Sequence, residues 1–391
     1  MRKKEFIKKR GIRLLLFGIF VFAAAFFLGS LSVCAEENED GTLPPEYSDF
    51  LDSIDGSVAD RLPDGVFSED AEEIEEAARE LVNPVNILSL MLDSLGAGVH
   101  KALPSLALVL GIVILSAIIS VFASSSGGMS RAVENCTRLC TFSAIAGMAV
   151  GCVESLGLYF DRLFTAVAAF VPLSGVLYAM GGNLTAASSG AASLGITLAV
   201  CQFFCTKTVI PVFCICLCLA LLSVFDGQGA SAGGAVSGTI KKWYTTSLAF
   251  VMMILTCSLS ASTLLSAKAD NMAMRGAKFA VSSFIPVSGG AVSSTLGTLA
   301  ASVELLSGSV GVIGIVLIIL MLIPTVVELA LMRAVFAIGG FCASTLGCPG
   351  EARLLSEIDS LYGYLEGIAA LSAAVFIIAF GIFAAIATPF G

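Results

Sequence analysis

Long apolar runs, each of twenty residues or more, dominate the chain and are separated by shorter polar stretches. Such a run is long enough to cross the roughly 30 Å hydrocarbon core of a bilayer as a helix. Six runs meet this criterion, at residues 103–123, 139–159, 194–225, 247–266, 310–332 and 365–387. The pattern therefore predicts an all-α polytopic membrane protein with about six firm transmembrane helices.

Two short segments between these runs repeat one motif. The first reads Phe170-Val171-Pro172-Leu173-Ser174-Gly175, and the second reads Phe284-Ile285-Pro286-Val287-Ser288-Gly289. Proline removes one helix hydrogen bond and glycine tolerates unusual backbone angles, so we expect a kinked or broken helix at each place. The two Pro/Ser/Gly-broken segments thus predict an internal repeat, with halves at about 137–225 and 247–335.

The path of these two segments through the membrane has two solutions. If each is re-entrant, the repeats are parallel and six basic residues of the membrane domain lie inside against four outside. If each crosses, the repeats are inverted, and seven of these basic residues lie inside against three outside, which slightly favours crossing. Hydropathy is divided, because residues 164–181 are apolar enough to span whereas residues 277–300 contain many Ser and Gly. Both solutions place the C-terminus outside.

The same segments carry the candidate pathway residues. Backbone groups freed by a broken helix must face protein or a water-filled cavity. Together with nearby hydroxyls they could line a polar path for a solute, and the hydroxyls belong to Ser174, Thr185, Ser188, Ser288, Ser293 and Thr295. The alternative is close helix packing, in which small residues such as Gly175 and Gly289 let helices approach. The sequence leaves both interpretations open.

Charged residues inside or next to the apolar runs are the second candidate signal. Lys207 interrupts the third run and Glu304 precedes the fifth, and each follows one of the two repeated segments. An ionisable group at membrane depth is costly and usually faces a partner or a cavity, so a mutual contact is conceivable. Interfacial snorkelling is the alternative. Glu328 and Arg333 are five residues apart, a spacing that does not place them on one helix face.

The N-terminus predicts export. Seven basic residues lie in the first thirteen positions, followed by an apolar run from Leu14 to Val33 and the small residues of a cleavage site. We expect residues 1–35 to be a signal peptide cleaved between Ala35 and Glu36, with an uncleaved anchor as the alternative. Residues 36–102 then form an acidic extracytoplasmic segment, in which an acidic helix up to Glu80 and an amphipathic helix starting at Asn83-Pro84 are expected. Residues 103–391 form the membrane domain.

Composition excludes several function classes. Apolar residues make up 57% of the chain and charged residues 13%, and the membrane domain has no basic excess that would favour nucleic acid. His100 is the only histidine, and neither a phosphate-binding loop nor a zinc protease motif is found. The twelve cysteines include no Cys-x-x-Cys pair with a histidine partner, so we interpret them as packing residues. The sequence predicts no catalytic residues, no metal site and no cofactor.

These features in this order resemble the stage III sporulation protein AE family. The stretch from Val167 to Ala186 resembles its first proline-containing segment, and Phe284 to Ser294 followed by Val310-Gly-Val-Ile-Gly314 resembles the second. The C-terminal run beginning at Arg353, the signal peptide and the acidic segment are also similar, so the likeness covers nearly the whole chain. Ser307-Gly308 stands where we would expect a basic residue.

The resemblance implies a mother-cell protein of endospore-forming bacteria in the outer forespore membrane. It implies a multi-pass subunit of a multiprotein channel that links mother cell and forespore and sustains forespore development. Its expected partners are the other membrane subunits of that complex, and it could act as the conduit for a small molecule of unknown identity. A stand-alone secondary transporter and a purely structural platform are the alternatives.

Overall fold

The computed structural model describes residues 44–68, 70–123, 130–180, 183–225, 231–284 and 289–387. The predicted signal peptide and its cleavage site at Ala35 and Glu36 lie outside these residues. Within them the regular elements are all helices, and no strand occurs. The all-α class predicted from the apolar pattern is therefore confirmed.

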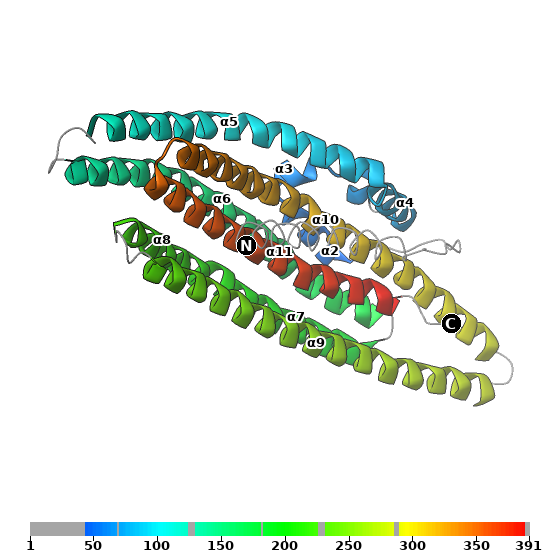
Figure 1. Ribbon diagram of the computed structural model, residues 1–391. Helices are drawn as coiled ribbons and strands as arrows, with labels where there is room; N and C mark the ends of the chain where they lie inside the picture. Colours follow the sequence, from blue (N-terminus) through cyan, green and yellow to red (C-terminus); the bar gives the residue numbers. More distant parts are fainter. Residues whose placement is uncertain are drawn as a thin grey trace.

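Six long helical elements run up and down the molecule side by side (Figure 1). Neighbours in sequence are antiparallel (Figure 1). Their bounds are α5 Pro84–Ala123, α6 Ser130–Met180, α7 Leu184–Gln202 with α8 Val209–Phe225, α9 Ser231–Phe284, α10 Gly289–Thr345 and α11 Pro349–Ala387. A π-helical stretch, Phe203–Thr208, joins α7 to α8 without a break.

Six spans in these elements are long and apolar enough to cross a membrane, and all six predicted runs overlap them. The spans are Met91–Val121, Cys136–Met180, Leu184–Ala220, Ala235–Asp270, Leu306–Thr345 and Pro349–Ala385. The protein is therefore a multi-pass membrane protein.

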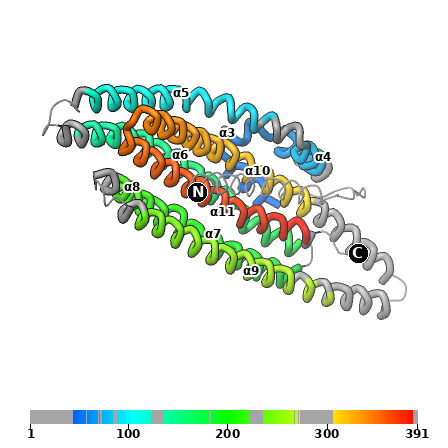
Figure 2. Tube along the Cα trace, viewed as in Figure 1, coloured from blue at the N-terminus to red at the C-terminus, as the bar shows by residue number. Residues whose placement is uncertain are grey.

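The helices are much longer than a bilayer requires. α6, α9 and α10 contain 51, 54 and 57 residues, which corresponds to about 76, 81 and 86 Å at 1.5 Å per residue. The hydrocarbon core accounts for roughly 30 Å of that length. More than half of each of these helices therefore extends beyond the hydrocarbon, and the tube in Figure 2 shows how far the bundle is drawn out.

α10 and α11 form the centre of the bundle, with α5, α6, α8 and α9 packed around them (Figure 1). The two helices approach closely at Gly311, which faces Ala384, and at Gly314, which faces the ring of Phe380. Their connection is short because Gly347 adopts a φ of +78° and ends α10. The Cys348 amide then donates to the carbonyl of Ala343 at 2.9 Å, and Pro349 begins α11.

Four short elements form an N-terminal unit on one side of the bundle: α2 Pro45–Asp52, α3 Gly56–Ala59, the 3₁₀ helix Asp64–Phe67 and α4 Ala71–Leu81. The hydroxyl of Tyr47 donates to the carbonyl of Val66 at 2.7 Å, and burial raises the pKa of that phenol. Phe50 packs edge-on against Phe170 of α6, and Arg162 of α6 lies 3.1 Å from Asp55. The Tyr47 hydrogen bond holds the unit together, and the contacts of Phe50 and Asp55 dock it on α6.

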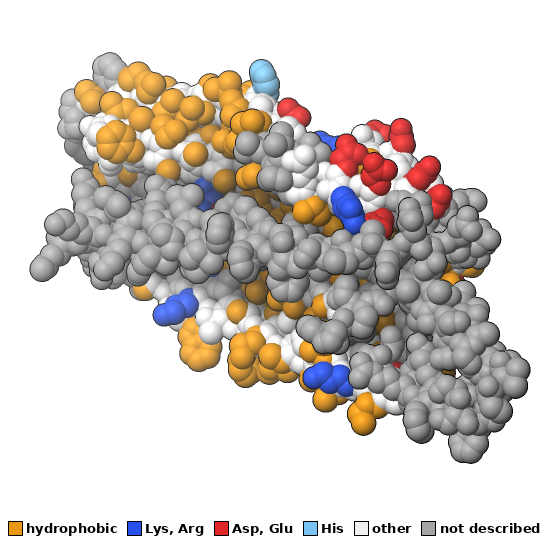
Figure 3. Space-filling view, turned by 90° about the vertical axis from the view of Figure 1, so that its right-hand side faces the viewer, with side chains coloured by type: hydrophobic (Ala, Val, Ile, Leu, Met, Phe, Trp, Pro, Cys, Tyr) orange, Lys and Arg blue, Asp and Glu red, His pale blue; other side chains and the backbone are white. Residues whose placement is uncertain are grey.

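The acidic helix expected up to Glu80 is only half solvated. Its inner face is buried, with Ile74, Ala77 and Ala78 inside, while Glu73 and Glu76 face outward. In the space-filling view the acidic side chains gather together, apart from the apolar surface of the bundle (Figure 3). The amphipathic helix begins at Pro84 as expected, but it continues unbroken to Ala123. The predicted interfacial helix and the first span are thus one helix.

The break expected at Pro172 is absent. α6 continues through Pro172 to Met180, because proline costs only one backbone hydrogen bond and the neighbouring Phe170 and Leu173 are held in the core. The exposed Pro172 ring lies on the outer side of the helix. α6 ends at Met180 and the antiparallel helix α7 begins at Leu184.

The second repeated segment lies mostly outside the described residues. α9 is described up to Phe284 and α10 from Gly289, so Pro286 and Ser288 are not described. The first segment is part of the α6 span Cys136–Met180. The slight preference for separate crossings stays a prediction.

Candidate functional site

Among the predicted pathway residues whose side chains the structure describes, Ser174 is the one that lies in the interior. Its hydroxyl donates to the carbonyl of Val171 at 2.7 Å, so the side chain bonds within its own helix. At the next residue, an added Cβ at Gly175 would lie 3.6 Å from the Cβ of Ala191 on α7. The first repeated segment therefore supplies both a buried hydroxyl and a close helix contact.

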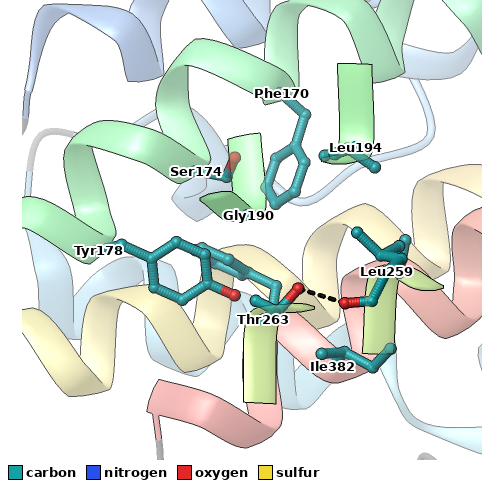
Figure 4. A pocket seen from close by; sticks show the side chains of 10 residues that line it. Phe170, Ser174, Tyr178, Gly190, Leu194, Leu259, Thr263 and Ile382 are labelled. Atoms are coloured by element: carbon teal, nitrogen blue, oxygen red, sulfur yellow. Dashed lines mark hydrogen bonds between the residues drawn. The ribbon is translucent and has the colours of Figure 1, made fainter. Parts of the chain in front are cut away.

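A small cavity of about 20 Å³ adjoins Ser174, where α6, α7, α9 and α11 meet (Figure 4). Its volume suffices for about one water molecule. Its polar lining comes from Ser174, Tyr178 and Thr263, whereas its remaining lining is small or apolar and comprises Phe170, Gly190, Leu194, Leu259, Ala379, Ile382 and Phe383. In this conformation the path proposed along the first segment is closed.

A seam of serines joins α7 to α9 beside that cavity. Ser189 donates to Ser266 at 2.8 Å, and Ser262 donates to Ser193 at 3.2 Å. At the start of α7, the buried carboxylate of Asp270 on α9 accepts from the amide of Ala186 at 2.9 Å. A carboxylate at a helix N-terminus satisfies an otherwise unpaired donor and complements the helix dipole. Polar contacts thus fix α7 onto α9.

The other end of α7 is the π-helical stretch that contains Lys207. The hydroxyl of Tyr244 on α9 donates to the carbonyl of Phe204 at 3.1 Å, within this stretch. A π-helical turn in the middle of a helix loosens the regular bonding pattern and is frequent at functional sites. α7 is therefore bounded by two backbone irregularities, the chain reversal after Met180 and this turn.

The predicted contact between Lys207 and Glu304 stays a prediction, because the side chain of Glu304 lies outside the described residues. Lys207 is exposed and belongs to the π-helical stretch between α7 and α8. This exposure fits the snorkelling alternative.

The densest group of charges lies between α9, α10 and α11. We name it the ionic cluster; its members are Lys241, Arg333, Glu357, Asp359 and Glu366. Arg333 pairs with Asp359 at 3.2 Å and also with Glu366, while Lys241 lies 3.5 Å from Glu357 and donates to Ser360 at 3.0 Å. Side-chain exposure ranges from 8% to 24%, so every member is largely withdrawn from solvent.

The cluster is shaped around the arginine. A Cβ added at Gly363 of α11 would lie 3.2 Å from the guanidinium carbon of Arg333, so the glycine leaves room for the group against the helix backbone. Glu328 lies five residues earlier on α10 and faces other helices, with Lys101 of α5 at 4.0 Å and Ser155 of α6. The sequence inference that Glu328 and Arg333 occupy different faces is consistent with these partners.

Sequence reasoning missed this cluster. It named Arg333 only for its spacing from Glu328 and assigned no role to the acidic residues of α11. The available signal was the seven-residue spacing of Asp359 and Glu366, which is two helical turns and places them on one face together with Gly363. All five members of the cluster lie within spans that are long and apolar enough to cross a membrane.

Metal and disulfide chemistry find no support among the residues that the structure describes. Those residues contain no group of three or more His, Cys, Asp or Glu side chains that could hold a metal ion. The eleven cysteines in the described ranges are free, including Cys342 and Cys348 on either side of the α10–α11 turn. Cys201 packs its sulfur 3.2 Å from that of Met252, as expected for a packing residue.

The fold and the cluster together define a helical multi-pass membrane protein with ionised groups buried between its central spans. The profile of the stage III sporulation protein AE family matches residues 72–387, which is most of the chain. The chain therefore belongs to the stage III sporulation protein AE family and is a sporulation membrane protein. The comparisons with curated proteins and with solved structures found no match.

Proposed function

We propose that this protein is a non-enzymatic subunit of a channel complex between mother cell and forespore, located in the outer forespore membrane, where it passes a small molecule. The observation that carries the proposal is the length of the bundle. Helices of about 76 to 86 Å exceed the hydrocarbon core by more than 40 Å. A bundle of that length offers a large surface outside the bilayer for partner subunits.

The passage itself is assigned to the interface of α6, α7, α9 and α11. The cavity at Ser174 lies there. α7 contacts α6 where Gly175 faces Ala191, and it contacts α9 where Gly190 faces Thr263. Small residues allow helices to slide with little steric cost, and the irregular backbone at both ends of α7 gives it freedom to move. Movement of α7 would widen the cavity into a path lined by the serine seam.

A matched pair of substitutions on α7 tests this passage. A Cβ at Gly190 would lie 3.3 Å from both Thr263 and Tyr178 and would fill the cavity, whereas a Cβ at Gly195 meets nothing within 4 Å. We expect Gly190→Ala to reduce late forespore gene expression at normal protein level. Gly195→Ala should leave expression unchanged. Normal expression with both variants would contradict a passage at this cavity.

Two further measurements separate the alternatives. Copurification of the full chain with ring-forming subunits of the complex is expected for a channel subunit. Solute movement by the purified protein alone in liposomes would instead indicate a stand-alone transporter. A structural platform predicts that Gly190→Ala lowers forespore expression only in proportion to a loss of protein.

A further inference from the structure

Stacked aromatic rings form the wall of the cavity between α6 and α11. Phe170 of α6 lines the cavity, and its ring points into it (Figure 4). That ring stacks on Phe380 of α11 with centroids 3.9 Å apart, and it meets Phe383 edge-on at 5.0 Å. Tyr178 of α6 meets Phe383 edge-on at 4.9 Å. The position of the Phe170 ring therefore sets the width of the cavity on this side.

The N-terminal unit contacts the same ring from outside the bundle. Phe50 of α2 packs edge-on against Phe170 with centroids 5.9 Å apart, and each of the two residues is 1% exposed. Eight residues earlier on α6, Arg162 pairs at 3.1 Å with Asp55, which lies between α2 and α3. A buried aromatic contact and an ion pair thus hold the unit against the cavity wall.

The unit connects this contact to α10. The hydroxyl of Tyr47 on α2 donates to the carbonyl of Val66 in the 3₁₀ helix at 2.7 Å. The 3₁₀ helix packs closely on α4, because a Cβ added at Gly65 would lie 3.0 Å from the carbonyl oxygen of Glu73 and 3.2 Å from the Cβ of Ala77. α4 in turn packs on α10. The N-terminal unit is therefore a bridge between α6 and α10.

Contacts between the central helices close this bridge into a loop. α10 meets α11 where Gly314 faces the ring of Phe380, and that ring stacks on Phe170. Phe170 meets Phe50, and the unit leads back to α10. Loss of the Phe50 contact opens the loop. The Phe170 ring then keeps only its partners on α11 and gains freedom to leave the cavity wall.

The docking of α2 responds to the surrounding solution at one point. The side chains of Arg162 and Asp55 are 40% and 34% exposed, so dissolved ions reach their ion pair. Salt weakens such an exposed pair, whereas it has little effect on the buried contact of Phe50. The strength of docking therefore depends on ionic conditions outside the bundle.

We propose that the N-terminal unit is a clamp on the passage, in which Phe50 acts through Phe170 to hold the cavity closed between α6 and α11. Undocking of α2 frees the Phe170 ring and widens the cavity. Phe50 is a positioning residue, because it contacts a residue of the cavity wall and is not itself part of the lining. The clamp rests on the proposed function, since it regulates the passage assigned to this cavity.

Thiol labelling at the cavity tests the clamp. The full-length protein in nanodiscs carries Ser174→Cys, and a small water-soluble methanethiosulfonate reports how accessible this thiol is, measured by mass spectrometry of the peptide that contains it. Labelling should be slow in this background and at least roughly tenfold faster when Phe50→Ala is added. Arg162→Gln should accelerate it by about two- to fivefold. High salt should have the same effect as Arg162→Gln and should add nothing to it.

Two controls separate the clamp from a general loss of structure. Phe67→Ala removes the same side chain from the same unit, but at a position that is 43% exposed, and it should leave the labelling rate unchanged. The native thiol of Cys152, buried on α6, becomes labelled only if the bundle loosens as a whole. Unchanged labelling in both Phe50→Ala and Arg162→Gln, or equal acceleration at Cys152, would overturn the clamp. Arg162→Gln and the salt response remain as tests should Phe50→Ala fail to fold.

The clamp and the passage fail by different measurements. Normal forespore expression in Gly190→Ala contradicts a passage at this cavity, whatever the labelling rates are. Unchanged labelling contradicts the clamp alone, because labelling reports the coupling between the N-terminal unit and the cavity and does not depend on the passenger.

Discussion

The close approach of α10 and α11 predicts how much stability is lost when one methyl group is added at Gly314. A Cβ at Gly314 would lie 1.9 Å from two ring carbons of Phe380, a distance that no real contact reaches. The ring cannot simply rotate away, because it is fully buried and stacks on Phe170 with centroids 3.9 Å apart. Gly314→Ala must therefore displace α11 or expel the Phe380 ring.

Gly308 on the same helix is the matched control. A Cβ at that position meets nothing within 4 Å, so Gly308→Ala gains only the helix propensity of alanine, about 1 kcal/mol. Gly314→Ala has the same gain but also an overpacking cost of about 1 to 3 kcal/mol. The gain in helix propensity is the same in both variants, so it cancels from the difference between their unfolding free energies. That difference should equal about 1 to 3 kcal/mol, with Gly314→Ala the less stable.

Thermal unfolding in detergent, followed by the fraction that remains monodisperse after heating, measures this difference. Gly311→Ala provides a second case, because its Cβ would lie 2.7 Å from the Cβ of Ala384 and 3.1 Å from its Cα. Backbone atoms cannot rotate away, so this variant should also be less stable than Gly308→Ala. Equal stability of all three alanine variants would show that α10 and α11 do not approach this closely.

Three further predictions concern caps, docking and the cluster. Asp270→Ala should lower the unfolding free energy by about 1 kcal/mol through loss of the cap on α7; a smaller loss in Asp270→Asn is the control, and no loss in either contradicts the cap. The raised pKa of Tyr47 means that its contribution to the stability of the N-terminal unit is complete below pH 10 and is lost as the pH rises further; proteolysis of α2 should increase there, and if Tyr47→Phe shows the same step, the phenol is not its source. Arg333→Gln and Glu366→Gln should each cost about 3 to 5 kcal/mol, and the double variant should cost less than their sum; strict additivity would show that the pair does not interact.

The apolar runs predicted the helices but not their ends. A hydropathy window detects the length of chain that lipid requires, and residues 139–159 satisfy it. α6 nevertheless continues to Met180, because beyond Tyr159 it packs against α2, α7 and α11 and no longer needs an apolar surface on all sides. Packing between helices decides such continuations, and a window along one segment contains no information about its neighbours.

Pro172 shows the same limit from another side. Its local sequence predicts a kinked or broken helix, yet it lies within the continuous helix α6. Proline disfavours a helix by about 3 kcal/mol, which the buried neighbours of Pro172 outweigh. Intrinsic preference is thus a small quantity compared with burial.

The position of Arg333, in contrast, follows from simple counting once the α10–α11 turn is recognised. The Gly347-Cys348-Pro349 sequence is a helix stop followed by a helix start. Arg333 lies fourteen residues before Gly347, and the residue fourteen positions after it is Leu361, between Asp359 and Glu366. Antiparallel helices joined by a tight turn keep this register, so the arginine must lie opposite the two carboxylates. The ionic cluster was therefore present in the spacing of the sequence, and what was missing was the pairing of two helices that both seemed merely apolar.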